Sequence, residues 1–302
     1  MSLLPSPPAT RHLGKSGIEV SSLAWGMWRF AGEVGPATAL VHAVLDAGIT
    51  FFDTADIYGF NGSDGFGDAE ALLGRVMAAD PSIRSRIVLA TKGGIMPPLP
   101  YDQSTAYLTS ALDASLSRLG VERVELYQVH RPDILTHPQE LARTLSDAVA
   151  AGKIASIGVS NMTCAQVAAL QKFLGDVPLV ATQPEISPLR IEPFENGEMD
   201  QAMLLGMTPL AWSPLGGGRI ADPVSGRDQA VVAALDAVAK PAGVSRTAAA
   251  YSWLMAHPAG IIPIVGTQNA GRVAEAADAY RVSWSRTEWY AVLVAARGVP
   301  LP

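Results

Sequence analysis

Three short apolar runs of this 302-residue chain each lead to side chains that can donate or accept a proton. FFDTADIYG carries the carboxylate Asp53 and the phenol Tyr58, IVLATK ends on Lys92, and VELYQVH ends on His130. An ammonium group beside a phenol eases its proton release, and a carboxylate keeps that ammonium charged. A positioned histidine can hydrogen-bond a substrate oxygen where negative charge develops. Together the four side chains predict a site that protonates a carbonyl oxygen while a hydride reaches the carbonyl carbon.

Each of these residues also has a structural explanation when it is taken alone. Asp53 could cap a helix, Tyr58 could line a core, Lys92 could be a solvated strand end, and His130 could be a buried, satisfied histidine. The functional interpretation therefore requires that the four meet in space. Parallel strands of one barrel would achieve this, because such barrels build their active sites at the carboxyl ends of the strands.

The chain alternates strand and helix signals eight times. Short β-rich runs are each followed by a segment of helical periodicity with a Gly, Asp or Pro at its edge. The expected strands are 23–28, 49–55, 87–92, 124–130, 154–160, 179–185, 208–214 and 260–266. The expected helices that follow them are 36–47, 68–79, 105–119, 138–151, 163–173, 196–205, 229–239 and 270–279. Eight such units predict an α/β protein with a (β/α)8 TIM barrel.

Three further segments are expected to be additions to the barrel. A turn at 15–17 within RHLGKSGIEVSS predicts an N-terminal β-hairpin. The segments 246–256 and 286–297 are predicted to be two additional helices packed on the barrel. No composition shift or long linker marks a second domain, so residues 1–302 are predicted to form a single barrel domain.

Composition narrows the class of protein. With 49% hydrophobic and 17% charged residues the chain can bury a large core, and a net charge of −6 without Lys/Arg blocks argues against nucleic-acid binding. No apolar run reaches the roughly 18 residues of a membrane span, and the proline-broken N-terminus lacks a signal-peptide core. The one cysteine, Cys164, is compatible with a reducing cytoplasm, and the five histidines show no metal-ligand spacing. We therefore expect a cytoplasmic protein with no metal site; the sequence carries no signal for an oligomeric state.

Seven motifs occur in an order that resembles the aldo-keto reductase family: FFDTADIYG, LATKGG, YQVHRPD, IGVSN, ATQPEISP, LAWSPLGGG and IPIVGT…R…E. The resemblance extends over nearly the whole chain and is greatest to the bacterial branch with EISPL after the sixth strand. It implies a (β/α)8 barrel, a nicotinamide cofactor bound without a Rossmann domain, and an Asp/Tyr/Lys/His tetrad. By motif match the tetrad falls on Asp53, Tyr58, Lys92 and His130, with Tyr58 as the general acid.

The same resemblance assigns residues to the nicotinamide end of the cofactor. Ser160, Asn161 and Gln183 fall on positions that hydrogen-bond the carboxamide, and Trp212 falls where an aromatic ring lies against the nicotinamide face. From the residues alone, Ser160 and Asn161 would instead be interpreted as an N-cap that precedes Cys164 and the helix there. An aromatic residue at a strand end is likewise often part of a core.

The rest of the cofactor is predicted to lie along two loops. Glycines in SPLGGGR let backbone N–H groups approach a pyrophosphate, and Arg219 could add charge. The resemblance assigns Ser213, Leu215 and Gly217 to the pyrophosphate, and Gly266, Thr267, Gln268, Arg272 and Glu275 to the adenosine end. In the family an arginine at the Arg272 position pairs with the 2′-phosphate of NADP. NADP(H) is therefore favoured over NAD(H). However, Gln268 stands where a basic residue is common in the family, and Ala276 stands where an Asn is common. These two departures predict some use of NAD(H) as well.

The opposite wall of the pocket is expected to come from three loops, with Trp28, Arg29, Met96, Tyr101 and Arg131. Aromatic and apolar walls with few polar groups suit a small carbonyl compound. The predicted function is an NADPH-dependent reductase of aldehydes or ketones. Two alternatives remain: a barrel that binds NADP(H) and reports its redox state without turnover, and a lyase in which Lys92 forms a Schiff base.

Overall fold

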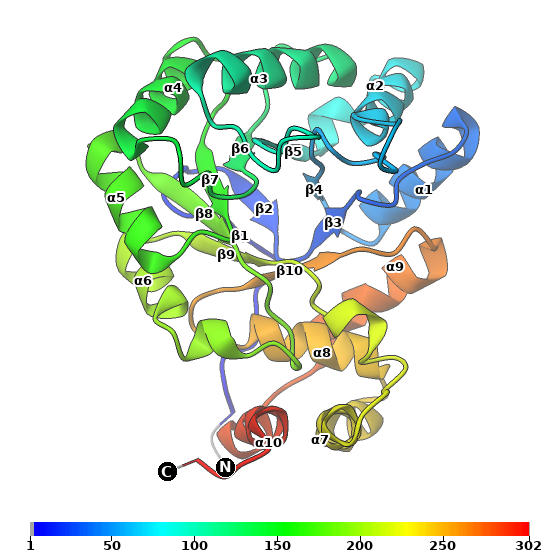
Figure 1. Ribbon diagram of the computed structural model, residues 1–302. Helices are drawn as coiled ribbons and strands as arrows, with labels where there is room; N and C mark the ends of the chain where they lie inside the picture. The colour runs from blue at the N-terminus through cyan, green and yellow to red at the C-terminus, as the bar shows by residue number, and fades with distance from the viewer. Residues whose placement is uncertain (1–2, 302) are drawn as a thin grey trace.

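A closed barrel of eight parallel strands organises the protein across residues 3–301, which the computed structural model describes (Figure 1). The barrel order is β10-β3-β4-β5-β6-β7-β8-β9, so neighbours in sequence are neighbours in space. The strands are β3 Ala24–Gly26, β4 Phe51–Asp53, β5 Val88–Gly93, β6 Leu126–Val129, β7 Ile157–Ser160, β8 Leu179–Gln183, β9 Thr208–Ala211 and β10 Ile262–Val265. Each lies within a segment that the sequence predicts to be a strand, apart from Gly93 at the end of β5. The predicted (β/α)8 barrel is confirmed.

Helices surround the barrel and connect its strands (Figure 1). They are α1 Val34–Asp46, α2 Asp68–Ala79, α3 Thr105–Leu119, α4 Pro138–Ala150, α5 Cys164–Leu174, α6 Glu198–Leu205, α7 Gly226–Ala242, α8 Arg246–Met255, α9 Ala270–Ala276 and α10 Arg286–Arg297. Short 3-10 segments are η1 Arg84–Arg86, η2 Glu192–Phe194, η3 Gly216–Gly218 and η4 Ala277–Arg281. None of the helices in residues 3–301 is long and apolar enough to span a membrane.

The period of two along the strands divides their side chains between two cores. On β4, Phe51 packs with Ala90, Leu126 and Ala181 in the cluster inside the barrel, whereas Phe52 packs in the outer cluster under the helices. Successive side chains of a strand point to opposite faces, so Asp53 returns to the inside one layer above Phe51. The same alternation places Lys92 above Ala90. A polar layer thus lies on an apolar layer within the barrel.

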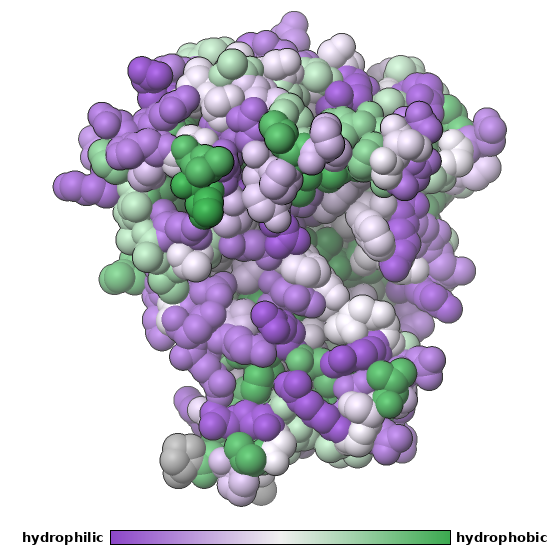
Figure 2. Space-filling model, viewed as in Figure 1, coloured by the Kyte–Doolittle hydropathy of each residue, from purple (hydrophilic) through white to green (hydrophobic). Residues whose placement is uncertain are grey.

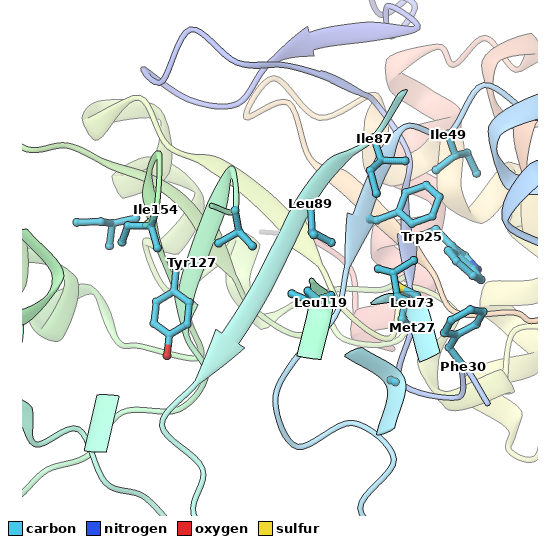
Figure 3. Packing of buried hydrophobic residues seen from close by; sticks show 14 of the residues in the cluster. Trp25, Met27, Phe30, Ile49, Leu73, Ile87, Leu89, Leu119, Tyr127 and Ile154 are labelled. Carbon is cyan, nitrogen blue, oxygen red and sulfur yellow. The ribbon is translucent and has the colours of Figure 1, made fainter. Parts of the chain in front are cut away.

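The outer core fixes the strands against the helices. Trp25, Met27, Phe30 and Leu73 lie together in Figure 3, and the Trp25 ring meets the rings of Phe30 and Phe52 edge to face at centroid distances of 5.3 and 5.1 Å. Edge-to-face aromatic pairs add stability beyond the apolar area that they bury. The loop after β3 and the start of β4 are therefore held by packing as well as by the strand pairing.

The predicted hairpin is confirmed and closes the amino end of the barrel. Strands β1 (Thr10–His12) and β2 (Glu19–Ser21) pair antiparallel, and Leu13 and Val20 enter the cluster inside the barrel. Gly14 in the turn has a φ of +51°, and a Cβ there would lie 2.3 Å from the Val180 carbonyl oxygen at the start of β8. Only glycine allows this close approach. The site is thus left with one open end, the carboxyl ends of the strands.

One helix assignment from the sequence is wrong. Segment 246–256 is predicted to be an addition, but α8 packs on β10 and is buried at every residue from Ala248 to Met255. Helix α7, predicted to be a barrel helix, instead packs along α10 at the foot of the molecule (Figure 1). The physical reason is burial: α7 has one apolar face, whereas α8 is apolar or small around most of its circumference. Helices α7 and α10 are the two additions.

Candidate active site

Lys92 is the centre of the polar layer inside the barrel. Its side chain is completely buried, and Nζ donates to Asp53 Oδ2 at 2.7 Å, to the Thr54 carbonyl oxygen at 2.8 Å and to the Tyr58 hydroxyl at 3.1 Å. A buried ammonium group requires such compensation because it has lost its water. Three of the four residues predicted from the sequence therefore meet through one nitrogen atom.

The turn after β4 positions Tyr58 over this nitrogen. The Thr54 amide donates to the Ala90 carbonyl at 2.9 Å and the Asp56 amide to the Lys92 carbonyl at 3.0 Å, which extends the β4–β5 pairing past the end of β4. The chain then turns, and the Tyr58 amide donates to the Ala55 carbonyl at 3.1 Å. Because backbone hydrogen bonds hold both ends of this turn, the phenol does not depend on a flexible loop for its position.

The ionisation of these groups follows from burial and from their mutual contacts. Burial raises the pKa of Tyr58, while the neighbouring Lys92 ammonium opposes that rise. For Lys92, burial lowers the pKa, but Asp53 and Tyr58 outweigh it and the net pKa lies above the ordinary value. At neutral pH the layer therefore holds a protonated phenol, an ammonium group and its carboxylate partner.

His130 lies beside Tyr58 rather than on the lysine. The two rings meet edge to face at a centroid distance of 5.8 Å. Burial, together with the Lys92 and Arg131 charges, holds the pKa of His130 well below its ordinary value. The imidazole is therefore neutral at pH 7. A neutral histidine at this place can donate one hydrogen bond without adding charge.

The residues predicted for the carboxamide form one connected group at the ends of β7 and β8. Ser160 Oγ donates to the Gln183 carbonyl at 2.8 Å, Asn161 Nδ2 donates to Ser160 Oγ at 2.6 Å, and Trp212 Nε1 donates to Asn161 Oδ1 at 2.9 Å. The alternative role of Ser160 and Asn161 as a helix cap is wrong, because Thr163 caps α5 in a capping box with Gln166. Asn161 has a φ of +55°, a strained backbone conformation for a residue other than glycine.

The glycine loop after β9 has an open backbone. Ser213 has a φ of +53°, and its Oγ accepts the Gly217 amide at 3.0 Å. A Cβ at Gly217 or Gly218 would meet no described heavy atom within 4 Å, so a ligand can approach the backbone there. Leu215 is half-buried between two apolar clusters. Arg219 lies 3.4 Å from the buried Asp228 carboxylate and is thus already engaged.

The residues predicted for the adenosine end lie on the loop after β10 and on α9. Gly266 is likewise open, whereas the Thr267 carbonyl accepts Trp25 Nε1 at 3.0 Å and Gln268 Nε2 donates to the Gly26 carbonyl at 3.2 Å. Glu275 accepts the Thr247 hydroxyl at 2.8 Å. Arg272 is exposed on α9, and its backbone amide is capped by Asn269. In this structure Gln268 and Glu275 therefore brace neighbouring elements.

The predicted pocket residues divide between the site and its rim. The Arg131 guanidinium lies 5.4 Å from the Trp212 ring centre and is close enough to influence the pKa values of Tyr58 and His130. Trp28 and Tyr101 are exposed, Met96 is half-buried, and Arg29 lies over the Trp28 ring at 4.7 Å. Figure 2 shows a mainly hydrophilic face on which apolar side chains form separate small patches. Arg131 is thus the pocket residue whose charge acts on two members of the tetrad.

Two contributions to the polar layer were not anticipated from the sequence. Gln128 Nε2 donates to Asp53 Oδ1 at 3.0 Å, and the Thr54 main-chain oxygen accepts a hydrogen bond from Lys92 Nζ. The signal for Gln128 was its period-two position, two residues after the inward-facing Leu126. A backbone carbonyl carries no signal in the sequence. Within residues 3–301 no group of three or more His, Cys, Asp or Glu side chains could hold a metal ion.

The fold and this site define the class of protein. Residues 22–292 match the model of the aldo/keto reductase family, and the chain belongs to that family. Members of the family are oxidoreductases that use nicotinamide cofactors. The predicted family and the predicted enzyme class are confirmed.

Individual relatives narrow the comparison. A 6-dehydroglucose reductase of Novosphingobium aromaticivorans is 67% identical over 306 residues, with 100% of each chain covered. A 6-dehydroglucose reductase of Agrobacterium fabrum is 37% identical, covering 93% of this chain and 96% of the relative. The crystal structure of a thermostable aldo-keto reductase in complex with the inhibitor epalrestat has a TM-score of 0.82 at 22% identity, over 95% of this chain and 99% of that chain. The last comparison supports the fold alone.

Proposed function

We propose that this chain is an NADPH-dependent carbonyl reductase that acts on a sugar aldehyde of the 6-dehydroglucose type. The observation that carries the chemistry is the Lys92 ammonium, which contacts both the Asp53 carboxylate and the Tyr58 hydroxyl within 3.1 Å. The substrate class comes from the two 6-dehydroglucose reductases at 67% and 37% identity, both of which are covered almost completely.

In the proposed reaction Tyr58 is the general acid. A bound nicotinamide cofactor supplies the hydride for the carbonyl carbon. Tyr58 gives its proton to the developing alkoxide oxygen, and Lys92 stabilises the phenolate that remains. Neutral His130 donates a hydrogen bond to the same oxygen and so fixes its direction. Asp53 keeps Lys92 charged throughout the reaction.

The proposed cofactor site uses the groups described above. Ser160, Asn161 and Gln183 would hold the carboxamide, with Trp212 against the nicotinamide ring. Ser213, Leu215 and Gly217 would hold the pyrophosphate, because the glycine loop lets phosphate oxygens come close to its backbone. The adenosine end is assigned to Gly266, Thr267, Gln268, Arg272 and Glu275. The open space at Gly217, Gly218 and Gly266 fits a cofactor that lies along these loops.

The substrate pocket is proposed to lie between the tetrad and the loops that carry Trp28, Arg29, Met96, Tyr101 and Arg131. The Arg131 guanidinium has planar N–H donors, which suit the vicinal hydroxyl groups of a sugar. The aromatic rings would contact its apolar face. A cytoplasmic location and a single domain over residues 1–302 stay predictions from the sequence; residues 1, 2 and 302 lie outside the part that the structure describes.

The test of the function is turnover with a panel of carbonyl compounds that includes 6-dehydroglucose. We expect saturable quenching of tryptophan fluorescence by NADPH and oxidation of NADPH that depends on the sugar aldehyde. Tight binding of NADPH with negligible turnover across the panel would instead favour the redox-sensing alternative. Borohydride trapping of a substrate on Lys92 would favour the Schiff-base alternative.

The pH dependence of the reaction follows from the pKa shifts. Because burial raises the pKa of Tyr58, the phenol stays protonated through neutral pH, and the rate of reduction falls only on the alkaline side. His130 is neutral because its pKa is lowered well below the ordinary value, so no change in rate is expected near pH 6.5, the ordinary histidine value. Measurement of kcat from pH 5.5 to 10 checks both. A step near the ordinary histidine value would show that His130 titrates there.

Arg272→Ala tests the cofactor preference. We expect the Kd for NADPH to rise by about 10- to 100-fold, the value of a charge-assisted contact, while the Kd for NADH changes little. The NADH titration on the same variant is the internal control. Gln268→Arg should have the opposite effect, because it adds a positive charge where the wild-type amide donates to the Gly26 carbonyl. If Arg272→Ala weakened the binding of NADPH and NADH equally, Arg272 would not be the residue that recognises the 2′-phosphate.

A further inference from the structure

Gln128 links the proton-donating group to the carboxamide group. It is completely buried on β6, where it pairs in register with Lys92 on β5 and Gly158 on β7. Gln128 Nε2 and Gln183 Nε2 both donate to Asp53 Oδ1 at 3.0 Å, and Gln183 Nε2 also donates to Gln128 Oε1 at 3.2 Å. The two amides and the carboxylate thus form a closed ring of hydrogen bonds.

The orientation of both amides in this ring is determined by charge. Asp53 forms an ion pair with Lys92, and the carboxylate of an ion pair can only accept hydrogen bonds. Each glutamine must therefore turn its nitrogen to Asp53, which leaves Gln128 Oε1 to accept the second proton of Gln183 Nε2. Both protons of the Gln183 amide are then used. Its oxygen does not take part in this ring and is available to another donor.

The barrel provides just enough room for this arrangement. A Cβ at Gly158 would lie 3.0 Å from Gln128 Cγ, closer than ordinary van der Waals contact. The glycine on the neighbouring strand therefore leaves the space that the Gln128 side chain occupies. A smaller or turned side chain at position 128 would lose the contact with Asp53.

We propose that Gln128 is a positioning residue that fixes the Gln183 amide with its oxygen toward the cofactor carboxamide and, at the same time, fixes Asp53 on Lys92. This inference rests on the proposed function, because it takes Gln183 as a carboxamide ligand and Tyr58 as the acid. It couples the two ends of the site through one side chain. Binding of the carboxamide and positioning of the acid then depend on each other, since coupling between two sites is reciprocal.

Gln128→Met tests the role, because Met has a similar shape but cannot donate to Asp53. We expect kcat to fall by about 10- to 100-fold, as for loss of a hydrogen bond to a charged group. We also expect a smaller ratio between the Kd values of 3-acetylpyridine and nicotinamide cofactors, measured by fluorescence, because the acetyl group lacks the N–H that Gln183 accepts. Wild-type kcat and an unchanged ratio would show that Gln128 only fills space.

Gln128→Glu separates hydrogen bonding from packing. The charged groups that face position 128 are Asp53 from β4 and Lys92 from β5. Burial and the Asp53 charge raise the pKa of the new carboxyl, and its protonated form can replace the amide donor. The variant should therefore keep most of its activity at low pH and lose it, as pH rises, earlier than the wild type. Activity as low as that of Gln128→Met at every pH would contradict the proposed donor role.

Gln171→Met is the matched control. The Gln171 side chain also forms a hydrogen bond with β8: its Oε1 accepts the backbone N–H of Leu179 at 2.8 Å. Leu179 is at the start of β8, whereas Gln183 is at its end. This variant should lose stability without the changes in cofactor ratio and pH profile. Failure of the proposed function is detected separately. If Tyr58→Phe keeps its activity, the proposed function is wrong. If Tyr58→Phe is inactive but Gln128→Met behaves like the wild type, only the proposed role of Gln128 is wrong.

Discussion

Tyr58→Phe is expected to lower kcat for reduction of the sugar aldehyde by about 10²- to 10⁴-fold, the usual contribution of a general acid. The variant loses the phenol oxygen, which accepts a hydrogen bond from Lys92 Nζ at 3.1 Å. Among the described side chains, Tyr58 is the only proton donor that hydrogen-bonds to Lys92. The ring still packs beside His130, so the fold and the Kd for NADPH should stay close to those of the wild type. Steady-state kinetics and a fluorescence titration on the same sample measure both quantities.

Tyr280→Phe is a suitable control for this substitution. Its hydroxyl donates to the Ala9 carbonyl at 3.4 Å and lies beside the backbone of Ser22 and Leu23, outside the polar layer. Loss of this hydroxyl should leave kcat unchanged. If Tyr58→Phe were fully active, the tetrad would have to be reassigned.

Lys92→Met is expected to reduce both activity and stability. The substitution leaves the buried Asp53 carboxylate without its charged partner, and breaking a buried ion pair from one side costs about 3–5 kcal/mol. It also removes the cation that stabilises the Tyr58 phenolate, so kcat should fall by at least about 10²-fold. Urea unfolding and steady-state kinetics measure the two effects separately.

The double variant Asp53→Asn/Lys92→Met distinguishes the two effects. It removes both charges, so it should recover most of the free energy of unfolding that Lys92→Met loses, because the unpaired buried charge is gone. Its activity should stay low, since Tyr58 still has no cation beside it. Recovery of activity together with stability would mean that Lys92 has only a structural role.

The polar layer could be predicted because it follows from a strict rule of strand geometry. Phe51 and Asp53, like Ala90 and Lys92, are two residues apart, so the period of two places each pair on the inside of the barrel. The strand ends could then be expected to meet. The same rule applied to Leu126 and Gln128 would have found Gln128, but a neutral amide within VELYQVH gave no chemical reason to single it out.

Other features depend on contacts between distant segments. The helical period gives the bounds of α7 and α8 but not which of the two packs on β10, because that depends on the burial of all sides of α8. Gln268, which the resemblance assigns to the adenosine end, donates to the Gly26 carbonyl, which is 242 residues away in the chain. Such choices are set by partners that are far away in the chain.

We propose that this chain moves a hydride to a carbonyl carbon while Tyr58 supplies the proton. The most direct test is reduction of the sugar aldehyde with NADPH deuterated at both C4 positions, followed by mass spectrometry of the alcohol. We predict one deuterium on the former carbonyl carbon with the wild type, and almost no product with Tyr58→Phe. NADPH binding without any deuterated alcohol from the whole carbonyl panel would show that the chain is not a carbonyl reductase and would favour a redox-sensing barrel.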